Sequence, residues 1–149
     1  METCLECGAV MEAAQVDLTH YSGLPKVTVP NVREWRCPSC GETELEIPRM
    51  NQLHRDIARG LAAKPSRLTS EEIRFLRVWL GFPVAGAFAA ALGVTPETVS
   101  RWENDKLEMK PAIERLLRTV VLMMPANGGP VEIPQPQSEA KEPLELVAG

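Results

Sequence analysis

The spacing of hydrophobic positions changes after residue 48, from alternation with polar residues to a repeat of three to four residues. In the front part, residues 15–21 alternate and residues 26–29 are rich in β-branched side chains, with a turn sequence at 22–25 between them. Two such runs flanking a turn predict a hairpin. Residues 32–36 and the alternating residues 44–47 extend this hairpin to a small sheet of three or four strands.

In residues 49–63 the apolar residues recur with helical spacing. The predicted helix ends before Pro65, because proline does not continue a helix. We interpret this segment as a connecting helix between two modules. The second module opens with Thr69 and Glu72, whose spacing is that of a capping box. An apolar stripe follows, and Gly81 ends the helix.

The following segment has the spacing of a helix-turn-helix. Ala89 is a small residue where two helices can cross, Gly93 lies four positions later in the turn, and Val99 can pack the second helix onto the first. Thr95 can cap that second helix, with Pro96 in its first turn.

One face of this second helix is predicted to be buried and the other exposed. Val99 and Trp102 point inward, which leaves Glu97, Thr98 and Arg101 outside. We assign Trp102 to the core and Glu103 to local helix pairing.

The outer face can meet the major groove of DNA. Arg101 can donate two hydrogen bonds to the edge of a guanine, and Glu97 can accept a hydrogen bond from a cytosine amino group. Thr95, Thr98 and Ser100 can contact the backbone, where the helix N-terminus also favours phosphate. The alternative for Arg101 is a simple surface pair with Glu97 at spacing i, i+4.

A last apolar stripe indicates either a dimer interface or packing into the chain's own core. A two-fold dimer would suit a palindromic DNA site. The stripe consists of Ile113, Leu116, Leu117, Val120, Val121 and Met124.

All four cysteines fall into two Cys-x2-Cys pairs, Cys4 with Cys7 and Cys37 with Cys40, and each pair is followed by a glycine. Two such knuckles can complete one closed tetrahedral site, which predicts one structural Zn²⁺ rather than a catalytic metal. Iron in a rubredoxin-like site is the alternative, because the same ligands bind it.

Charge divides the chain in the same way as the hydrophobic pattern. Residues 1–48 carry three Lys or Arg and eight Asp or Glu, residues 49–124 carry twelve and eight, and residues 125–149 carry one and four. A basic middle part suits a polyanion, and an acidic front part suits another partner. The last segment lacks periodicity and predicts a disordered, acidic, Pro-rich tail.

Other sequence features limit the class of protein. No apolar run is long enough to span a bilayer, and no signal-peptide pattern is present, so we expect a cytoplasmic protein with no membrane partner and reduced cysteines. No catalytic constellation is present, so we do not expect an enzyme. The predicted class is α+β, with a zinc ribbon at 1–48, the connecting helix at 49–65 and an all-α, five-helix helix-turn-helix domain at 66–124.

Two stretches of the sequence resemble known families. Residues 94–103, VTPETVSRWE, resemble the recognition helix of the Xre/Cro-like family. The front part, with its cysteine pairs, Tyr21-Ser22-Gly23 and Trp35, resembles the YgiT-type zinc finger, and both halves in this order are similar to the MqsA antitoxins. Helix-turn-helix domains often have Gln where Ala85 stands and Gly where Asp105 stands, and the second difference implies an altered turn at Asp105. The antitoxin family tends to have Asn where Glu97 stands.

The resemblance implies a sequence-specific transcriptional repressor, homodimeric through its helical domain. It also implies the antitoxin of a type II toxin-antitoxin pair, whose zinc domain binds a toxin such as an mRNA interferase. The alternative is a stand-alone regulator or a protein-interaction adaptor without a toxin partner.

Overall fold

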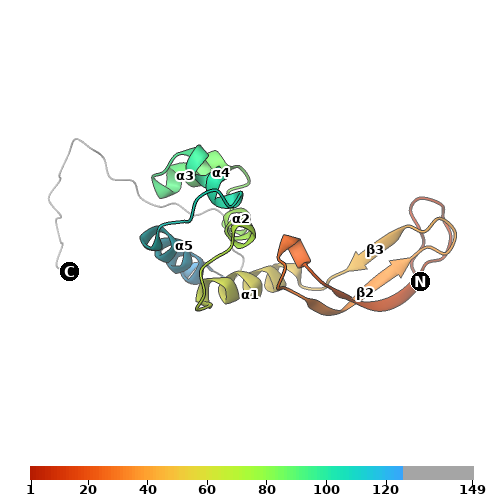
Figure 1. Ribbon diagram of the computed structural model, residues 1–149. Helices are drawn as coiled ribbons and strands as arrows, with labels where there is room; N and C mark the ends of the chain where they lie inside the picture. The colour runs from red at the N-terminus through yellow and green to blue at the C-terminus, as the bar shows by residue number, and fades with distance from the viewer. Residues whose placement is uncertain (126–149) are drawn as a thin grey trace, which may run out of the picture.

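The structure, a computed structural model, describes residues 1–125 and consists of one antiparallel sheet followed by five helices (Figure 1). The strands β1 (Glu12–Leu18), β2 (Val29–Arg36) and β3 (Thr43–Glu46) lie in the order β1-β2-β3. The ribbon formed by the sheet projects away from the helices, and the N-terminus lies at its far end (Figure 1). The predicted α+β class is confirmed.

The hairpin forms with a different extent from the one predicted. Residues 26–28 are not in a strand, and Leu18 pairs with Val29 while Val16 pairs with Val32. The connection at 19–28 contains a short 3-10 helix, η1 (Tyr21–Gly23). The prediction failed at 26–28 because the connection packs against the helices, where Leu24 is only 1% exposed.

The helices are α1 (Met50–Ala63), α2 (Ser70–Trp79), α3 (Ala85–Leu92), α4 (Pro96–Glu103) and α5 (Pro111–Met123). The predicted capping box is confirmed, since the Glu72 N–H donates to Thr69 Oγ1 and the Thr69 N–H donates to Glu72 Oε1. Gly81 follows α2 with a φ of 94°, a left-handed conformation that glycine adopts readily.

The predicted connecting helix, α1, contributes to the same apolar core as α2 to α5. Ala58, Leu61 and Ala62 are buried in that core, and α1 lies along α5. Hydrogen bonds join the two helices as well, because the Arg118 guanidinium donates to the carbonyl of Ala62. The five helices therefore include α1, with four of them in residues 66–124.

The ribbon is anchored at both ends and exposed between them. A small cluster of buried Cys4, Met11 and Cys37, with Trp35 packed against it, forms at the far end. At the near end the connection at 19–28 joins the helical core. Between these ends most side chains of β1 and β3 are exposed, so the sheet has little core of its own.

The last helix, α5, largely uses its apolar stripe within its own domain. Leu117 and Val121 are fully buried, and Ile113, Val120 and Met124 are partly buried against the same core. An exposed apolar strip remains on α5, where Leu116 and Met123 lie two turns apart on the same face.

Within residues 1–125, none of the helices combines the length and the apolar character that crossing a membrane requires. The tail predicted for 125–149 lies outside the described residues, apart from Pro125.

Candidate metal centre and nucleic-acid interface

The two cysteine pairs form matching knuckles. The Gly8 N–H donates to the Cys4 carbonyl at 2.8 Å, and the Gly41 N–H donates to the Cys37 carbonyl at 3.0 Å. Both glycines are left-handed, with φ of 75° and 82°, a conformation that lets the chain turn tightly after the second cysteine and that glycine adopts readily.

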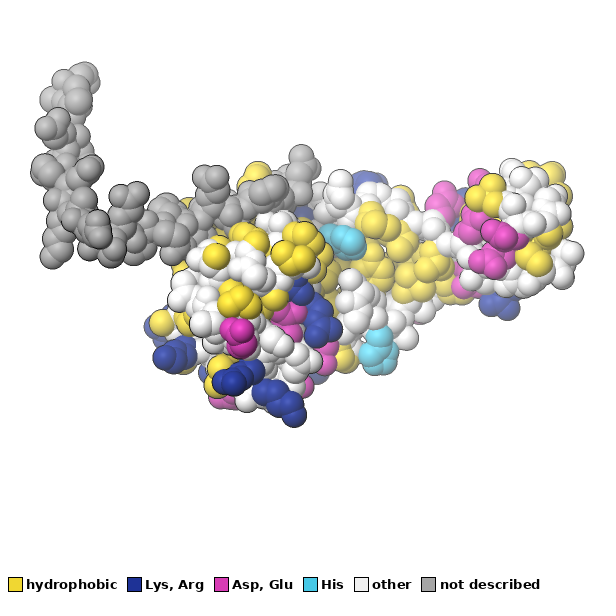
Figure 2. Space-filling model, turned by 90° about the horizontal axis from the view of Figure 1, so that it is seen from above, with side chains coloured by type: hydrophobic (Ala, Val, Ile, Leu, Met, Phe, Trp, Pro, Cys, Tyr) yellow, Lys and Arg dark blue, Asp and Glu magenta, His cyan; other side chains and the backbone are white. Residues whose placement is uncertain are grey.

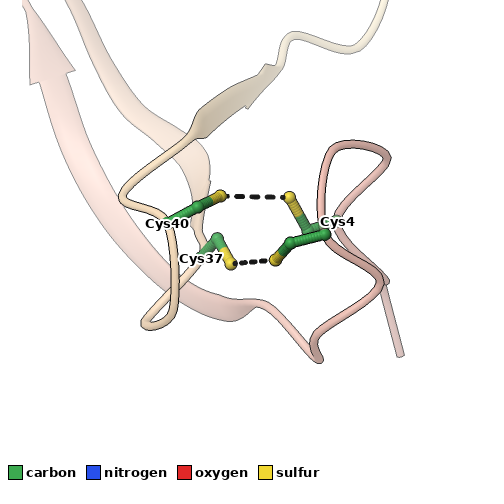
Figure 3. A group of neighbouring side chains, drawn as sticks. Cys4, Cys37 and Cys40 are labelled. Carbon is green, nitrogen blue, oxygen red and sulfur yellow. Dashed lines mark hydrogen bonds between the residues drawn. The ribbon is translucent and has the colours of Figure 1, made fainter.

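The knuckles bring the four sulfur atoms together (Figure 3). The Sγ atoms of Cys4 and Cys40 are 3.6 Å apart, those of Cys7 and Cys37 are 3.4 Å apart, and all four lie within 4.8 Å of one another. A tetrahedron with Zn–S bonds of about 2.3 Å has sulfur–sulfur edges of roughly 3.8 Å. The cluster therefore fits a structural metal ion with all four positions filled by protein.

Local hydrogen bonds prepare one thiol for ionisation. The backbone N–H of Cys40 is the main cause that lowers the pKa of Cys37 to about 6. The Glu42 N–H acts on Cys40 in the same direction, but the neighbouring thiols and burial outweigh it and raise the pKa of Cys40 to about 12. A divalent cation among the sulfurs favours the thiolate form of all four.

The helix-turn-helix packing follows the three predicted positions. Ala89 on α3 and Val99 on α4 are fully buried, and Gly93 caps α3 with a φ of 73°. The small side chain of Ala89 allows α3 and α4 to pack closely against each other where they cross. The predicted motif is thus confirmed.

The start of α4 is fixed by its cap. Thr95 Oγ1 accepts a hydrogen bond from the Thr98 N–H at 3.2 Å, and the two hydroxyl oxygens lie 2.8 Å apart. Pro96 occupies the first turn, as predicted. Thr95 is exposed and Thr98 is half-buried, so the cap lies at the surface.

The outer face of α4 presents Glu97, Ser100 and Arg101, all exposed. Sequence reasoning missed Asn104, whose side-chain amide donates to the Ser100 carbonyl at 2.7 Å and to its hydroxyl oxygen at 3.3 Å. The spacing i, i+4 was the available signal for this contact.

Arg101 has a free guanidinium in the part of the chain that the structure describes, where no hydrogen bond or ion pair joins it to Glu97. The alternative of a local surface pair is therefore not realised among these residues. Both charged groups remain available to a partner.

The end of α4 is held by a buried ion-pair network rather than by the predicted local pairing of Glu103. Glu103 accepts hydrogen bonds from Arg77 at 3.0 Å and from Arg74 at 3.1 Å, both on α2. Arg77 also donates to the carbonyls of Phe82 and Pro83, each at 2.9 Å, in the turn before α3. The network ties α4 to α2 and to that turn.

Asp105, in the turn after α4, adopts a left-handed conformation of the kind that glycine adopts readily, so the structure does not show the altered turn that the resemblance implied. Its φ is 56°, a left-handed value that Asp adopts more readily than most residues. The Ser70 hydroxyl donates to Asp105 Oδ1 at 2.8 Å, which holds this conformation against the start of α2.

Comparison with known proteins agrees with the helical part of this description. The model of a helix-turn-helix family, HTH_3, matches residues 73–118, which include α3, α4 and most of α2 and α5. No curated protein and no solved structure matches the chain. Because HTH_3 is a family of DNA-binding regulators rather than of enzymes, the match supports a DNA-binding transcription regulator.

Proposed function

We propose that the protein is a sequence-specific transcriptional repressor that inserts α4 into the major groove. The observation that carries this proposal is the position of Arg101, exposed on the outer face of α4 while Val99 and Trp102 bury the opposite face. A bidentate contact from such an arginine to guanine is the commonest specific contact in the major groove. Glu97 then accepts from a cytosine amino group.

The start of α4 positions the protein on the DNA backbone in this proposal. Thr95, Thr98 and Ser100 offer hydroxyl groups near the first turn, where free backbone N–H groups favour phosphate. These contacts fix orientation and carry no sequence information, which leaves base readout to Arg101 and Glu97.

A homodimer on a palindromic operator completes the DNA-binding proposal. The exposed strip of Leu116 and Met123 on α5 supports it, because exposed apolar side chains on one helix face favour association. Two α4 helices one helical turn of DNA apart would double the contacts.

We further propose that the metal is Zn²⁺ and that the ribbon binds a toxin, as in a type II toxin-antitoxin pair. Acidic side chains gather toward the ribbon end and basic ones on the helical part (Figure 2). Residues 1–48 are strongly acidic, and the exposed sheet offers surface to a basic protein. A toxin that acts on mRNA must bind a polyanion, so a basic surface is expected of it.

The DNA-binding proposal is tested by fluorescence anisotropy with the DNA upstream of the protein's own gene, at fixed near-physiological salt with scrambled competitor. Tight binding that survives the competitor supports an autoregulatory repressor. Weak binding without sequence preference would overturn it and favour a protein-interaction adaptor.

The toxin proposal needs a separate experiment. Co-expression with the neighbouring gene product should yield a complex that residues 49–125 alone do not form. A DNA-binding protein that captures no such partner would be a stand-alone regulator.

A further inference from the structure

A cavity of about 290 Å³ lies where the ribbon meets the helices. Phe75, Val78 and Trp79 of α2 provide a mostly apolar lining, and Ser22 and Gly23 of η1 close one side. Pockets that bind small ligands are typically apolar with a few convergent polar groups. This cavity has that composition and is not used in the proposed DNA contacts.

Three ionisable side chains also line the cavity, namely His54 of α1 and Glu71 and Arg74 of α2. Arg74 Nε donates to the Glu103 carboxylate at 3.1 Å and Nη2 donates to the Glu103 backbone carbonyl at 3.2 Å, which leaves Nη1 without a hydrogen bond among residues 1–125. His54 Nε2 lies 2.8 Å from the Tyr21 hydroxyl, so this contact braces η1 against α1 beside the cavity.

Glu71 is negatively charged and Arg74 positively charged, so together they can bind a ligand that carries one charge of each sign. Glu71 and Arg74 are three positions apart on α2, so they are neighbours on the helix surface. A carboxylate suits Arg74 because its Nη1 can donate a charge-assisted hydrogen bond to it, and an ammonium group suits Glu71. The volume lies near the lower limit for ligand pockets, roughly 300 Å³, which restricts the occupant to a small molecule.

We propose that this cavity binds a small aromatic amino acid or a close derivative, with its ring against Phe75, Val78 and Trp79. Its carboxylate binds Arg74 and its ammonium group binds Glu71. The site regulates DNA binding, because Arg74 also holds Glu103 at the end of α4. A ligand carboxylate on Arg74 competes with Glu103 and loosens the recognition helix, so the ligand lowers operator affinity.

Ligand binding is tested without DNA, by isothermal titration of the full chain with L-phenylalanine. We expect a dissociation constant on the order of 1 mM or tighter, given the modest affinity per atom of small ligands. Phenethylamine, which lacks the carboxylate, and 3-phenylpropionate, which lacks the ammonium group, should each bind at least about tenfold more weakly, since each loses one charged contact.

Two variants test whether the ligand binds in the cavity or elsewhere on the surface. Val78→Trp fills the cavity and should abolish binding, whereas Val84→Trp changes a side chain that is 64% exposed and does not line the cavity, and should retain binding. No binding to the unmodified protein, or equal binding to both variants, would overturn the proposed site.

The regulatory part of the proposal rests on the proposed DNA-binding function and has its own readout. Saturating L-phenylalanine should weaken operator binding by about fivefold or more, within the usual range of coupling between sites. The Val78→Trp protein should show no such response. A ligand that binds without changing operator affinity would overturn the regulation and leave the site intact, and the titration without DNA is unaffected if the protein has no operator.

Discussion

Arg77 of α2 and Glu103 at the end of α4 form a bidentate ion pair. Arg77 Nε donates to one carboxylate oxygen of Glu103 and Nη2 to the other, both at 3.0 Å. The two side chains are only 10% and 5% exposed. Buried charges are tolerated when paired with good geometry, and removing one partner leaves the other uncompensated. The ion pair therefore fixes the orientation of α4 relative to α2.

Glu103→Ala should destabilise the protein by about 3–5 kcal/mol, because the buried Arg77 charge loses its partner. Urea denaturation followed by circular dichroism measures this change. Glu97→Ala is the matched control on the same helix, since an exposed side chain that pairs with none of residues 1–125 should change stability by at most about 0.5 kcal/mol. Equal effects of the two substitutions would show that the ion pair does not hold α4.

Sequence patterns predicted the helix-turn-helix more fully than they predicted what holds it. Ala89, Gly93 and Val99 were informative because each satisfies a local requirement of size or backbone conformation. The pairing of Glu103 with Arg77 joins residues 26 positions apart. Such a contact depends on how helices cross, which periodicity does not specify.

Metal removal should unfold the far end of the ribbon and spare the helices. The cluster of Cys4, Met11 and Cys37 belongs to a separate small core, and little else holds that end together. Chelation of the purified protein should remove the amide signals of that end from its NMR spectrum while far-ultraviolet circular dichroism retains the helical signal. Signals from Leu24 should persist, because that residue is buried in the helical core. Loss of all helical signal would contradict two separate cores.

The connection at 19–28 shows where β-branched composition misled the prediction. The β-branched residues at 26–29 have the composition of a strand, but Val27 packs against the helical core and only Val29 enters β2. Competition between strand pairing and burial in a distant core is not visible in local sequence. The same limitation applies to α1, whose apolar face predicted a helix correctly without identifying α5 as its partner.

Acid should destabilise the helical domain through Glu114. Burial opposes ionisation of this carboxyl, but hydrogen bonds from Arg67 and the Leu68 N–H, with the charges of Arg67 and Arg118, outweigh burial and lower its pKa. A pKa lowered by folding gives stability that is present above the unfolded value, about 4.3, and is lost as the pH falls through the folded value.

Glu114→Gln should therefore flatten the dependence of unfolding free energy on pH below about pH 5. Denaturation curves collected between neutral and acidic pH provide the comparison. Glu108→Gln, at an exposed position, should leave the slope unchanged. An unchanged slope in the Glu114 variant would mean that other carboxylates cause the acid sensitivity.

The exposed strip on α5 predicts that Leu116→Glu weakens self-association. Placing a charge in an apolar interface leaves it desolvated and unpaired, which should raise the dimer dissociation constant at least about tenfold. Analytical ultracentrifugation over a concentration series measures this constant. Leu45→Glu, on the ribbon, tests whether any exposed leucine has the same effect, and a dimer unaffected by Leu116→Glu would place the interface elsewhere.

Base readout by Arg101 is best tested with two substitutions at that position. Arg101→Ala removes both the positive charge and the bidentate hydrogen-bond donors. It should lose about 1–3 kcal/mol of discrimination between bases at one base pair in each half-site. Arg101→Lys retains the positive charge but not the planar fork, so it should keep most of the affinity for mixed-sequence DNA while losing most of that discrimination. Binding measured against operators substituted at every position, at constant salt, separates the two effects. If both variants keep the base preference of the unmodified protein and lose only general affinity, Arg101 contacts phosphate, and the sequence is read by other residues of α4 such as Glu97.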